Sequence, residues 1–320
     1  MYHRFSWPVA ILSFLLTALL GLSLGPGGLD PFPGQQIFFI RLARVLLASL
    51  VGSGLAASGA ALQSILGNPL AEPYLLGVSG GAACGTALAL VLGISSDLLG
   101  VFSLQAFSFA FGAGAIFLVY RLARVHGRRP AETMILSGVV VNAFFSGLIM
   151  LMMSLADRQL NEMIYILMGS LGIMFTRENA VLLAIAGGLT WGGVAYLWGR
   201  SRNLNLMILG EAQARSLGVE VENFKRSVFF LTALMVAALV SLAGVIGFVG
   251  LIVPHLGRLL SGPDNRRLIP VSALLGAGLL ILSDTIARSL GGAEIPVGVV
   301  TALLGVPFFI FLLAKRKASS

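Results

Sequence analysis

Apolar segments recur along almost the whole chain, with only short polar stretches between them. The 320 residues are 57% hydrophobic and 11% charged, whereas a soluble domain carries about 25% charged residues. So few charges cannot cover the surface of a soluble domain, and most of this surface must therefore face lipid. In lipid the backbone is satisfied only in helices or in a closed barrel, and long runs without alternation favour helices. The sequence therefore predicts an all-α polytopic membrane protein.

Ten segments are predicted to cross the membrane, all within one transmembrane domain, residues 1–320. Their approximate bounds are 7–24, 41–66, 75–92, 101–123, 133–154, 181–198, 228–242, 246–260, 270–288 and 296–313. Residues 163–172 are apolar but too short to cross, which predicts a re-entrant or surface helix. The first run is predicted to be a retained span rather than a signal peptide, because no small-residue cleavage site follows it.

The basic residues predict the orientation of these ten spans. If the N-terminus lies inside and the spans alternate, 16 of the 21 lysines and arginines fall on the inner side. Loops on the cytoplasmic side of a membrane carry such an excess. We therefore expect a multi-pass membrane protein with both termini in the cytoplasm. The same bias accounts for the net charge of +8, so we expect no nucleic-acid partner.

Many of the 40 glycines are spaced as they are where helices touch. Small residues let helix backbones approach closely in lipid, where no hydrophobic force drives helices together. The sequence therefore predicts a tightly packed bundle. The candidate contact positions are Gly52, Gly54, Gly59, Gly112, Gly114, Gly244, Gly247, Gly250, Gly276 and Gly278.

Several kinds of chemistry are missing from the sequence. None of the three lysines follows a glycine, so the chain has no G-x-x-x-x-G-K-[ST] loop to hold nucleotide phosphates. ATP, if it drives this protein, must be used by a partner subunit, and we expect this chain to bind no cofactor. The single cysteine, Cys84, excludes a disulfide within the chain and a cysteine-based metal site, and no metal site is expected.

Two functions of other classes remain open from the residues alone. Gly77-Val78-Ser79-Gly80 fits the G-x-S-G pattern of intramembrane serine proteases, which need a histidine base such as His255 near the serine. An ion-coupled carrier needs an acid within the membrane, and Asp284 is the candidate. However, Arg288 lies one helical turn after Asp284 and is expected to pair with it, which favours a structural salt bridge.

Three arginines lie on the predicted outer side against the general bias. Arg41 and Arg44 are three residues apart at the start of the second span, and Arg288 ends the ninth. Arginine forms two parallel hydrogen bonds with a carboxylate, so the three predict docking of an acidic partner outside the membrane. The alternative is that Arg41 and Arg44 only extend to the lipid headgroups.

Residues 210–218, G-E-A-Q-A-R-S-L-G, lie in the longest polar segment, on the predicted inner side. They predict a short helix that ends at glycine. Two interpretations remain open for this helix. It is either a docking helix for a cytoplasmic subunit or a solvated surface helix.

Five stretches of the chain together resemble one protein family. They are R-L-A-R-V-L-L at 41–47; S-G-A-A-L-Q and N-P-L-A-E-P-Y-L-L-G-V-S-G-G-A between 58 and 82; L-N-L-M-I-L-G-E-A-Q-A-R-S-L-G-V at 204–219; G-F-V-G-L-I-V-P-H-L-G-R at 247–258; and L-S-D-T-I-A-R and E-I-P-V-G-V-V-T-A-L-L-G-V-P-F-F between 282 and 309. In their order they resemble the permease subunit of type II ABC importers, which carry iron chelates, haem or cobalamin. The family's R-L-P-R appears here as R-L-A-R, with Ala43 in place of the proline.

The resemblance implies ten helices per subunit and a homodimer with a central translocation path. It also implies two cytoplasmic ATPase subunits and an extracytoplasmic substrate-binding protein, so that the chain itself is not an enzyme. Iron–siderophore is the commonest substrate of this family, and haem and cobalamin are close alternatives.

The resemblance also assigns roles to individual residues. Arg41, Arg44 and Arg288 would meet glutamates of the binding protein. Residues that would couple to the ATPase are Gly210, Glu211, Ala212, Ala214, Arg215, Leu217 and Gly218. The cytoplasmic gate would comprise Pro130, Ala131 and Glu132, although family members often carry small hydroxyl residues where Glu132 stands. The fifth span would line the translocation path with Asn142 and Ser146.

Overall fold

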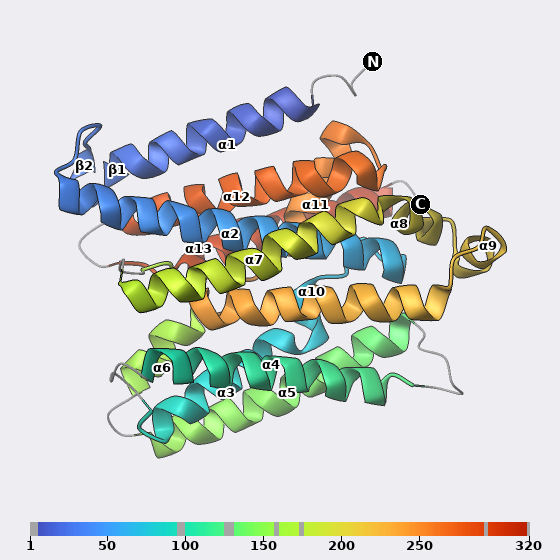
Figure 1. The fold of residues 1–320 in the computed structure, drawn as a ribbon, viewed down its shortest axis with the longest axis horizontal. Helices are drawn as coiled ribbons and strands as arrows, with labels where there is room; N and C mark the ends of the chain where they lie inside the picture. Colours follow the sequence, from blue (N-terminus) through green and yellow to red (C-terminus); the bar gives the residue numbers. More distant parts are fainter. Residues whose placement is uncertain are drawn as a thin grey trace.

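Helices that run along one common direction make up almost all of the chain (Figure 1). The structure is a computed structural model, and it describes residues 6–94, 100–124, 131–156, 160–172, 176–290 and 294–318. Within these ranges a two-residue antiparallel hairpin, β1 (Leu24–Gly25) with β2 (Gly28–Leu29), joins the first two helices. The helices are α1 (Ser6–Ser23), α2 (Gln35–Leu66), the 3₁₀ helix η2 (Pro73–Leu76), α3 (Val78–Val91), α4 (Gly100–Leu122), α5 (Ala131–Leu155), α6 (Leu160–Leu167), α7 (Arg177–Gly199), α8 (Ser201–Ile208), α9 (Glu211–Ser216), α10 (Val221–Ala243), α11 (Val249–Ser261), α12 (Asn265–Ser289) and α13 (Val297–Ala318).

The predicted fold class is confirmed. Among the described residues, six helices are long and apolar enough to cross a membrane, namely α2, α4, α5, α7, α10 and α12. Four shorter apolar helices lie in α1, α3, α11 and α13. These ten helices coincide one by one with the ten predicted spans.

The helix boundaries differ from the prediction where polar turns extend beyond the apolar core. Helices α2, α10 and α12 begin five to seven residues earlier than predicted, at Gln35, Val221 and Asn265. Asp264 caps α12, because its side chain accepts a hydrogen bond from the backbone N–H of Arg266. A helix can therefore begin in a polar segment, before the hydrophobic pattern starts.

Helix α2 forms the centre of the bundle. In its most apolar stretch 89% of the residues are buried, compared with 28% in each of α4, α5 and α7. The exposed apolar side chains of those outer helices are available to lipid, whereas α2 packs against protein on nearly all sides. Helix α2 ends at Leu66, where Gly67 adopts the left-handed conformation with φ 58° and terminates the helix.

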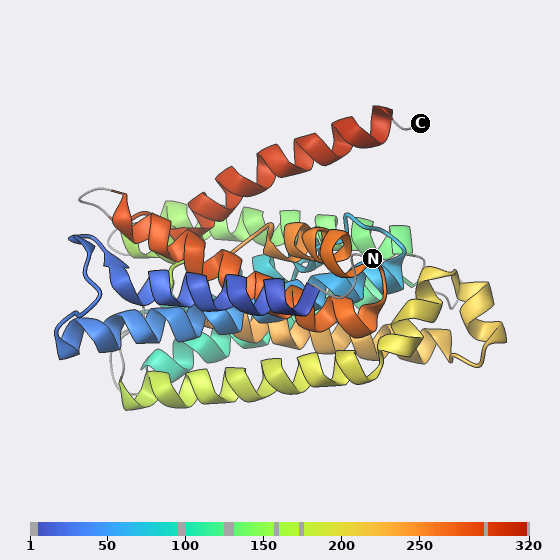
Figure 2. The same ribbon diagram turned by 90° about the horizontal axis from the view of Figure 1, so that it is seen from above.

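The bundle has two distinct ends (Figure 1). We call one the hairpin end, where β1, β2, the start of α2 and the end of α12 lie. We call the other the α9 end, where α9 projects beyond the long helices. Helix α13 leans away from the rest of the bundle in the second view (Figure 2). The two ends and the splayed helix position the candidate functional sites.

Glycines form the contacts between α2 and its neighbours. A Cβ atom added at Gly52 would collide with the backbone carbonyl of Gly276 in α12, and one at Gly59 with the carbonyl of Gly250 in α11. The predicted close approach of helices at these glycines is therefore confirmed. Open space surrounds Gly114 and Gly247, where the spacing predicts a contact.

A Gly52→Leu variant should lower the stability of the protein by about 3 kcal/mol, because a rigid backbone carbonyl occupies the place of the new side chain. The midpoint of thermal unfolding in detergent measures this loss. Gly187→Leu is the matched control, since no atom lies within 4 Å of a Cβ built at Gly187 in α7. Equal midpoints for both variants would contradict the packing described here.

Candidate functional site

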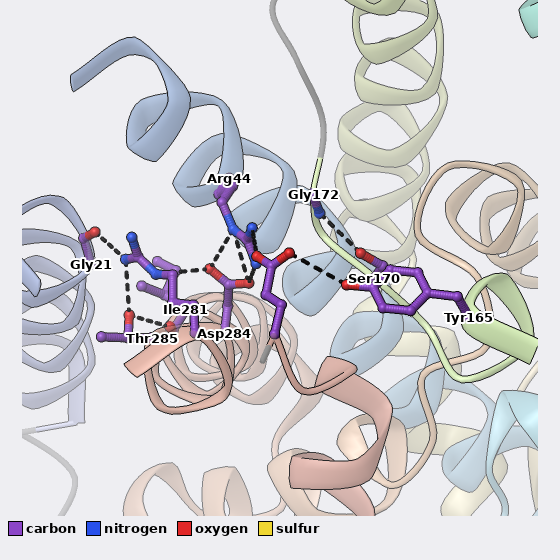
Figure 3. Close-up of polar contacts among 10 residues, drawn as sticks. Gly21, Arg44, Tyr165, Ser170, Gly172, Ile281, Asp284 and Thr285 are labelled. Atoms are coloured by element: carbon purple, nitrogen blue, oxygen red, sulfur yellow. Dashed lines mark hydrogen bonds and ion pairs between the residues drawn. The ribbon is translucent and has the colours of Figure 1, made fainter. Parts of the chain in front are cut away.

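Three arginines and two carboxylates gather at the hairpin end, and Figure 3 shows the contacts of Arg44 and Asp284 among them. They come from α2, from α12 and from the segment just before α13. We call this group the arginine cluster, and its members are Arg41, Arg44, Asp284, Arg288 and Glu294.

Arg44 lies at the centre of the arginine cluster. Its Nη2 donates to Asp284 Oδ1 at 2.7 Å, and its Nε lies 3.2 and 3.3 Å from the two carboxylate oxygens of Asp284. Its remaining terminal nitrogen, Nη1, donates to Glu294. Only 3% of the Asp284 side chain is exposed, compared with 42% of the Glu294 side chain. Arg44 therefore bridges one buried and one accessible carboxylate.

The other two arginines fasten α1 and the hairpin segment to α2 and α12. Arg41 Nη1 donates to the carbonyls of Leu22 at 2.9 Å and Asp30 at 3.1 Å. Arg288 Nε lies 3.4 Å from Asp284 Oδ2, and Arg288 Nη2 donates to the carbonyl of Gly21 (Figure 3). The predicted pairing of Asp284 with Arg288 is confirmed.

The structure brings the three predicted docking arginines into one place but leaves little of them exposed. Arg41, Arg44 and Arg288 expose 7%, 9% and 5% of their surface. Three guanidinium groups and two carboxylates leave one excess positive charge among these contacts. A carboxylate from outside would find a favourable field there, yet would have to displace a group that is already bound.

Asp284 is not a free acid of the kind that an ion-coupled carrier needs. Two arginines hold its carboxylate, and 3% of its side chain is exposed. The serine of the protease-like pattern, Ser79, lies in the first turn of α3 and is 3% exposed. Both positions therefore favour the structural interpretation of these residues.

The predicted short helix at the other end is confirmed as α9, which follows Gly210 and ends before Gly218 (Figure 1). Both glycines have positive φ, 112° and 86°, which side chains rarely tolerate. Among the other predicted coupling residues, Ala214 is fully buried. The exposed ones are Glu211, Ala212, Arg215 and Leu217.

An ion pair ties α9 to the long helix α10. Lys225 Nζ donates to Glu211 Oε1 at 2.8 Å, and 4% of the Lys225 side chain is exposed compared with 46% of the Glu211 side chain. A buried ammonium group is costly unless it is paired, so the pair holds α9 in a fixed place on α10. Residue spacing did not indicate this contact, because Glu211 and Lys225 lie 14 residues apart.

Helix α8 lies beside α9 and was not predicted. Its apolar residues Leu204 and Met207 are three apart and buried, and this spacing is the signal that could have revealed it. Asn205 of α8 donates to Asp264 at 2.6 Å. Burial acts to raise the pKa of the Asp264 carboxyl, but hydrogen bonds from the Arg266 N–H and the Asn205 amide outweigh it and hold this pKa below its ordinary value.

The predicted gate and path residues lie on or near α5. Ala131 and Glu132 begin α5 at the α9 end, and Glu132 is exposed, whereas Pro130 lies outside the residues that the structure describes. Asn142 packs against Gly80 of α3, and its buried Oδ1 has no hydrogen-bond partner within the described ranges. Ser146 is half-buried.

A cavity of about 1060 Å³ opens between α5, α11 and the splayed helix α13. Its walls are almost entirely apolar, and neither Asn142 nor Ser146 is among its lining residues. This cavity could not be predicted from the sequence, because its lining comes from segments far apart in the chain. Representative lining residues are Leu70, Glu72, Ile135, Phe248, Val299 and Val306.

Comparisons with known proteins agree with one another. The model of the FecCD transport family matches residues 9–315. The cobalamin import permease BtuC of Halobacterium salinarum is 42% identical over 87% of this chain and 73% of its own length. The vitamin B12 import permease BtuC of Escherichia coli O127:H6 is 38% identical over 97% and 95%. The molybdate import permease MolB of Haemophilus influenzae is 38% identical over 90% and 84%.

Solved structures give the same result. An inward-facing structure of a metal-chelate type ABC transporter superposes with a TM-score of 0.86 at 35% identity, covering 98% of this chain and 100% of the other. The fold and the comparisons together define the membrane-spanning permease of a type II ABC importer. Within that class, the chain belongs to the FecCD transport family.

Proposed function

We propose that this permease moves a metal chelate, with cobalamin as the first candidate, across the bacterial inner membrane in a binding-protein-dependent importer. The observation that carries the proposal is the placement of an arginine cluster and a projecting α9 at opposite ends of one bundle, with a large apolar cavity in its side. One end is thus suited to bind an acidic partner, and the other offers a helix to a second partner.

The hairpin end faces outward in this proposal, and the α9 end faces the cytoplasm. The basic side chains support this orientation, because most arginines that the structure describes lie at the α9 end, as the bias of membrane loops requires. Both chain termini then lie in the cytoplasm. The binding protein docks on the arginine cluster, and two ATPase subunits bind the α9 helices of two permease copies.

A second copy of the chain completes the translocation path. The cavity between α5, α11 and α13 is open at the side of one subunit, and a two-fold related copy would turn two such cavities into one central path. Its apolar walls hold few groups that could bind a chelate tightly. Weak binding allows the chelate to leave the path on the inner side. Ala131, Glu132 and Pro130 form the inner gate in this proposal, and Asn142 and Ser146 lie on the helix that moves.

Transport then follows from the rocking of packed units. ATP closes the two ATPase subunits, α9 passes the movement through the Lys225–Glu211 pair to α10, and α5 shifts with the packed bundle. This chain carries out no covalent step, and ATP is used by the partner subunit.

The proposed substrate rests on the relatives. Two of those described above are named for cobalamin or vitamin B12 and one for molybdate, so we place cobalamin ahead of iron–siderophore and haem. The permease–ATPase complex in liposomes, with its binding protein, should be offered cyanocobalamin, a ferric siderophore, haem and molybdate in parallel. We expect uptake of cyanocobalamin. Uptake of only one of the other ligands would contradict the assignment of cobalamin as substrate, but it would still support the importer function.

A further inference from the structure

We propose that Glu294 occupies the place of the binding protein's carboxylate in the undocked permease, and that docking displaces it from Arg44. The released Glu294 also leaves Tyr165, so that docking loosens the contact between α6 and the segment before α13. This inference rests on the proposed docking role of the arginine cluster. It adds two features to that role. Glu294 is an internal carboxylate that the partner can replace on Arg44, and its displacement links docking to the wall of the cavity.

The two carboxylates on Arg44 differ in the way that an exchange requires. Asp284 takes Nε and Nη2 of Arg44, is bound by Arg288 as well, and exposes 3% of its side chain. Glu294 takes only Nη1 and exposes 42% of its side chain. An arriving carboxylate can therefore reach the position of Glu294 but not that of Asp284.

The charge of the arginine cluster favours the exchange. With Glu294 in place, three guanidinium groups face two carboxylates. Arg41 donates hydrogen bonds to two neutral backbone carbonyls, those of Leu22 and Asp30. Once Glu294 leaves, the excess of one positive charge becomes two, and an acidic partner that supplies a carboxylate restores the balance.

Glu294 also connects the arginine cluster to α6 (Figure 3). The Tyr165 hydroxyl of α6 donates to Glu294 Oε2 at 3.4 Å. Three residues later, the backbone N–H of Val297 donates to the carbonyl of Gly169 at 3.1 Å, and Gly298 packs against the Met168 carbonyl. The segment from Glu294 to Gly298 therefore lies along the end of α6.

The end of α6 borders the cavity. Leu167 and Met168 from this end, and Gly298 from the start of α13, are all lining residues. A displacement of Glu294 therefore acts on the wall of the cavity at the end where the binding protein would deliver its ligand. Docking of the binding protein would thus change the cavity wall at the hairpin end.

Glu294→Gln tests the exchange, because it keeps the shape of the side chain and removes its charge. The cognate binding protein, immobilised on a biosensor, should bind the variant permease–ATPase complex about fivefold more tightly than the parent, since the internal competitor is weakened. Tyr165→Phe removes only the second bond of Glu294 and should tighten docking by about twofold. Glu178→Gln, the same change of charge in the first turn of α7 at the same end, should leave docking unchanged.

The outcomes separate this inference from the docking function beneath it. If Arg44→Glu abolishes docking while Glu294→Gln leaves it unchanged or weakens it, the docking site stands and the exchange is overturned. If Arg44→Glu binds like the parent, the docking function itself is wrong. A gain of affinity in Glu294→Gln cannot result from misfolding, so tighter docking in that variant supports the exchange.

Discussion

An Arg41→Glu, Arg44→Glu double variant should lose docking of the binding protein by at least about 100-fold, because removal of buried charge partners costs several kcal/mol and reversal adds repulsion. The arginine cluster would change from three guanidinium groups and two carboxylates to one and four. The dissociation constant of the cognate binding protein from the purified complex measures the effect. The ATPase subunits should still copurify, since the site proposed for them, α9, lies at the opposite end.

Because Arg41 and Arg44 are buried, the controls must separate docking from folding. Arg177→Glu changes an exposed arginine at the same end, at the start of α7, and should alter affinity by less than about threefold. Arg44→Lys keeps the charge but loses the two-pronged contact with Asp284, and should give an intermediate affinity. Parental affinity in the double variant would show that the binding protein docks elsewhere.

The second large effect is expected at the other end of the bundle. Lys225→Glu should reduce ATP-driven uptake at least about tenfold, because it replaces a buried ion pair with two facing carboxylates and frees α9 from α10. The number of substrate molecules carried per ATP hydrolysed is the measurement, since loss of coupling lowers this ratio even where the complex assembles. Arg226→Glu, an exposed neighbour on α10, should leave the ratio unchanged.

A charge swap gives this prediction a second readout. Lys225→Glu with Glu211→Lys rebuilds the pair in the opposite sense, although the lysine then lies at the more exposed position. We expect it to restore part of the lost ratio. Equal ratios in Lys225→Glu and the parent would mean that α9 transmits no motion through this pair.

The ten helices could be predicted because each needs its own apolar run, and such runs are local in the sequence. Arg41, Arg44 and Arg288 could be recognised for a similar reason, because they lie on the predicted outer side, where few basic residues are expected. The contacts of Arg44 could not be predicted in full. Arg288 lies one turn from Asp284 and was expected to pair with it, but the closer partner, Arg44, lies 240 residues away.

Features that depend on packing between distant segments could not be predicted from the sequence. Glu294 lies 250 residues from Arg44, and its contact with Tyr165 joins α6 to the segment before α13, which no sequence pattern relates. The cavity likewise depends on the direction in which α13 leaves the bundle, which its apolar run does not specify. Helix α8 was missed for a different reason, because its two buried residues stand in a segment that is otherwise polar.

The most direct test of the account is uptake into liposomes that hold the permease–ATPase complex, with ATP inside and the binding protein with labelled cyanocobalamin outside. The account predicts uptake only when ATP and the binding protein are both present, and no change when a protonophore and an ionophore collapse the ion gradients. Uptake that continues without ATP or without the binding protein, and that stops when the ion gradients collapse, would contradict the importer mechanism proposed for this permease.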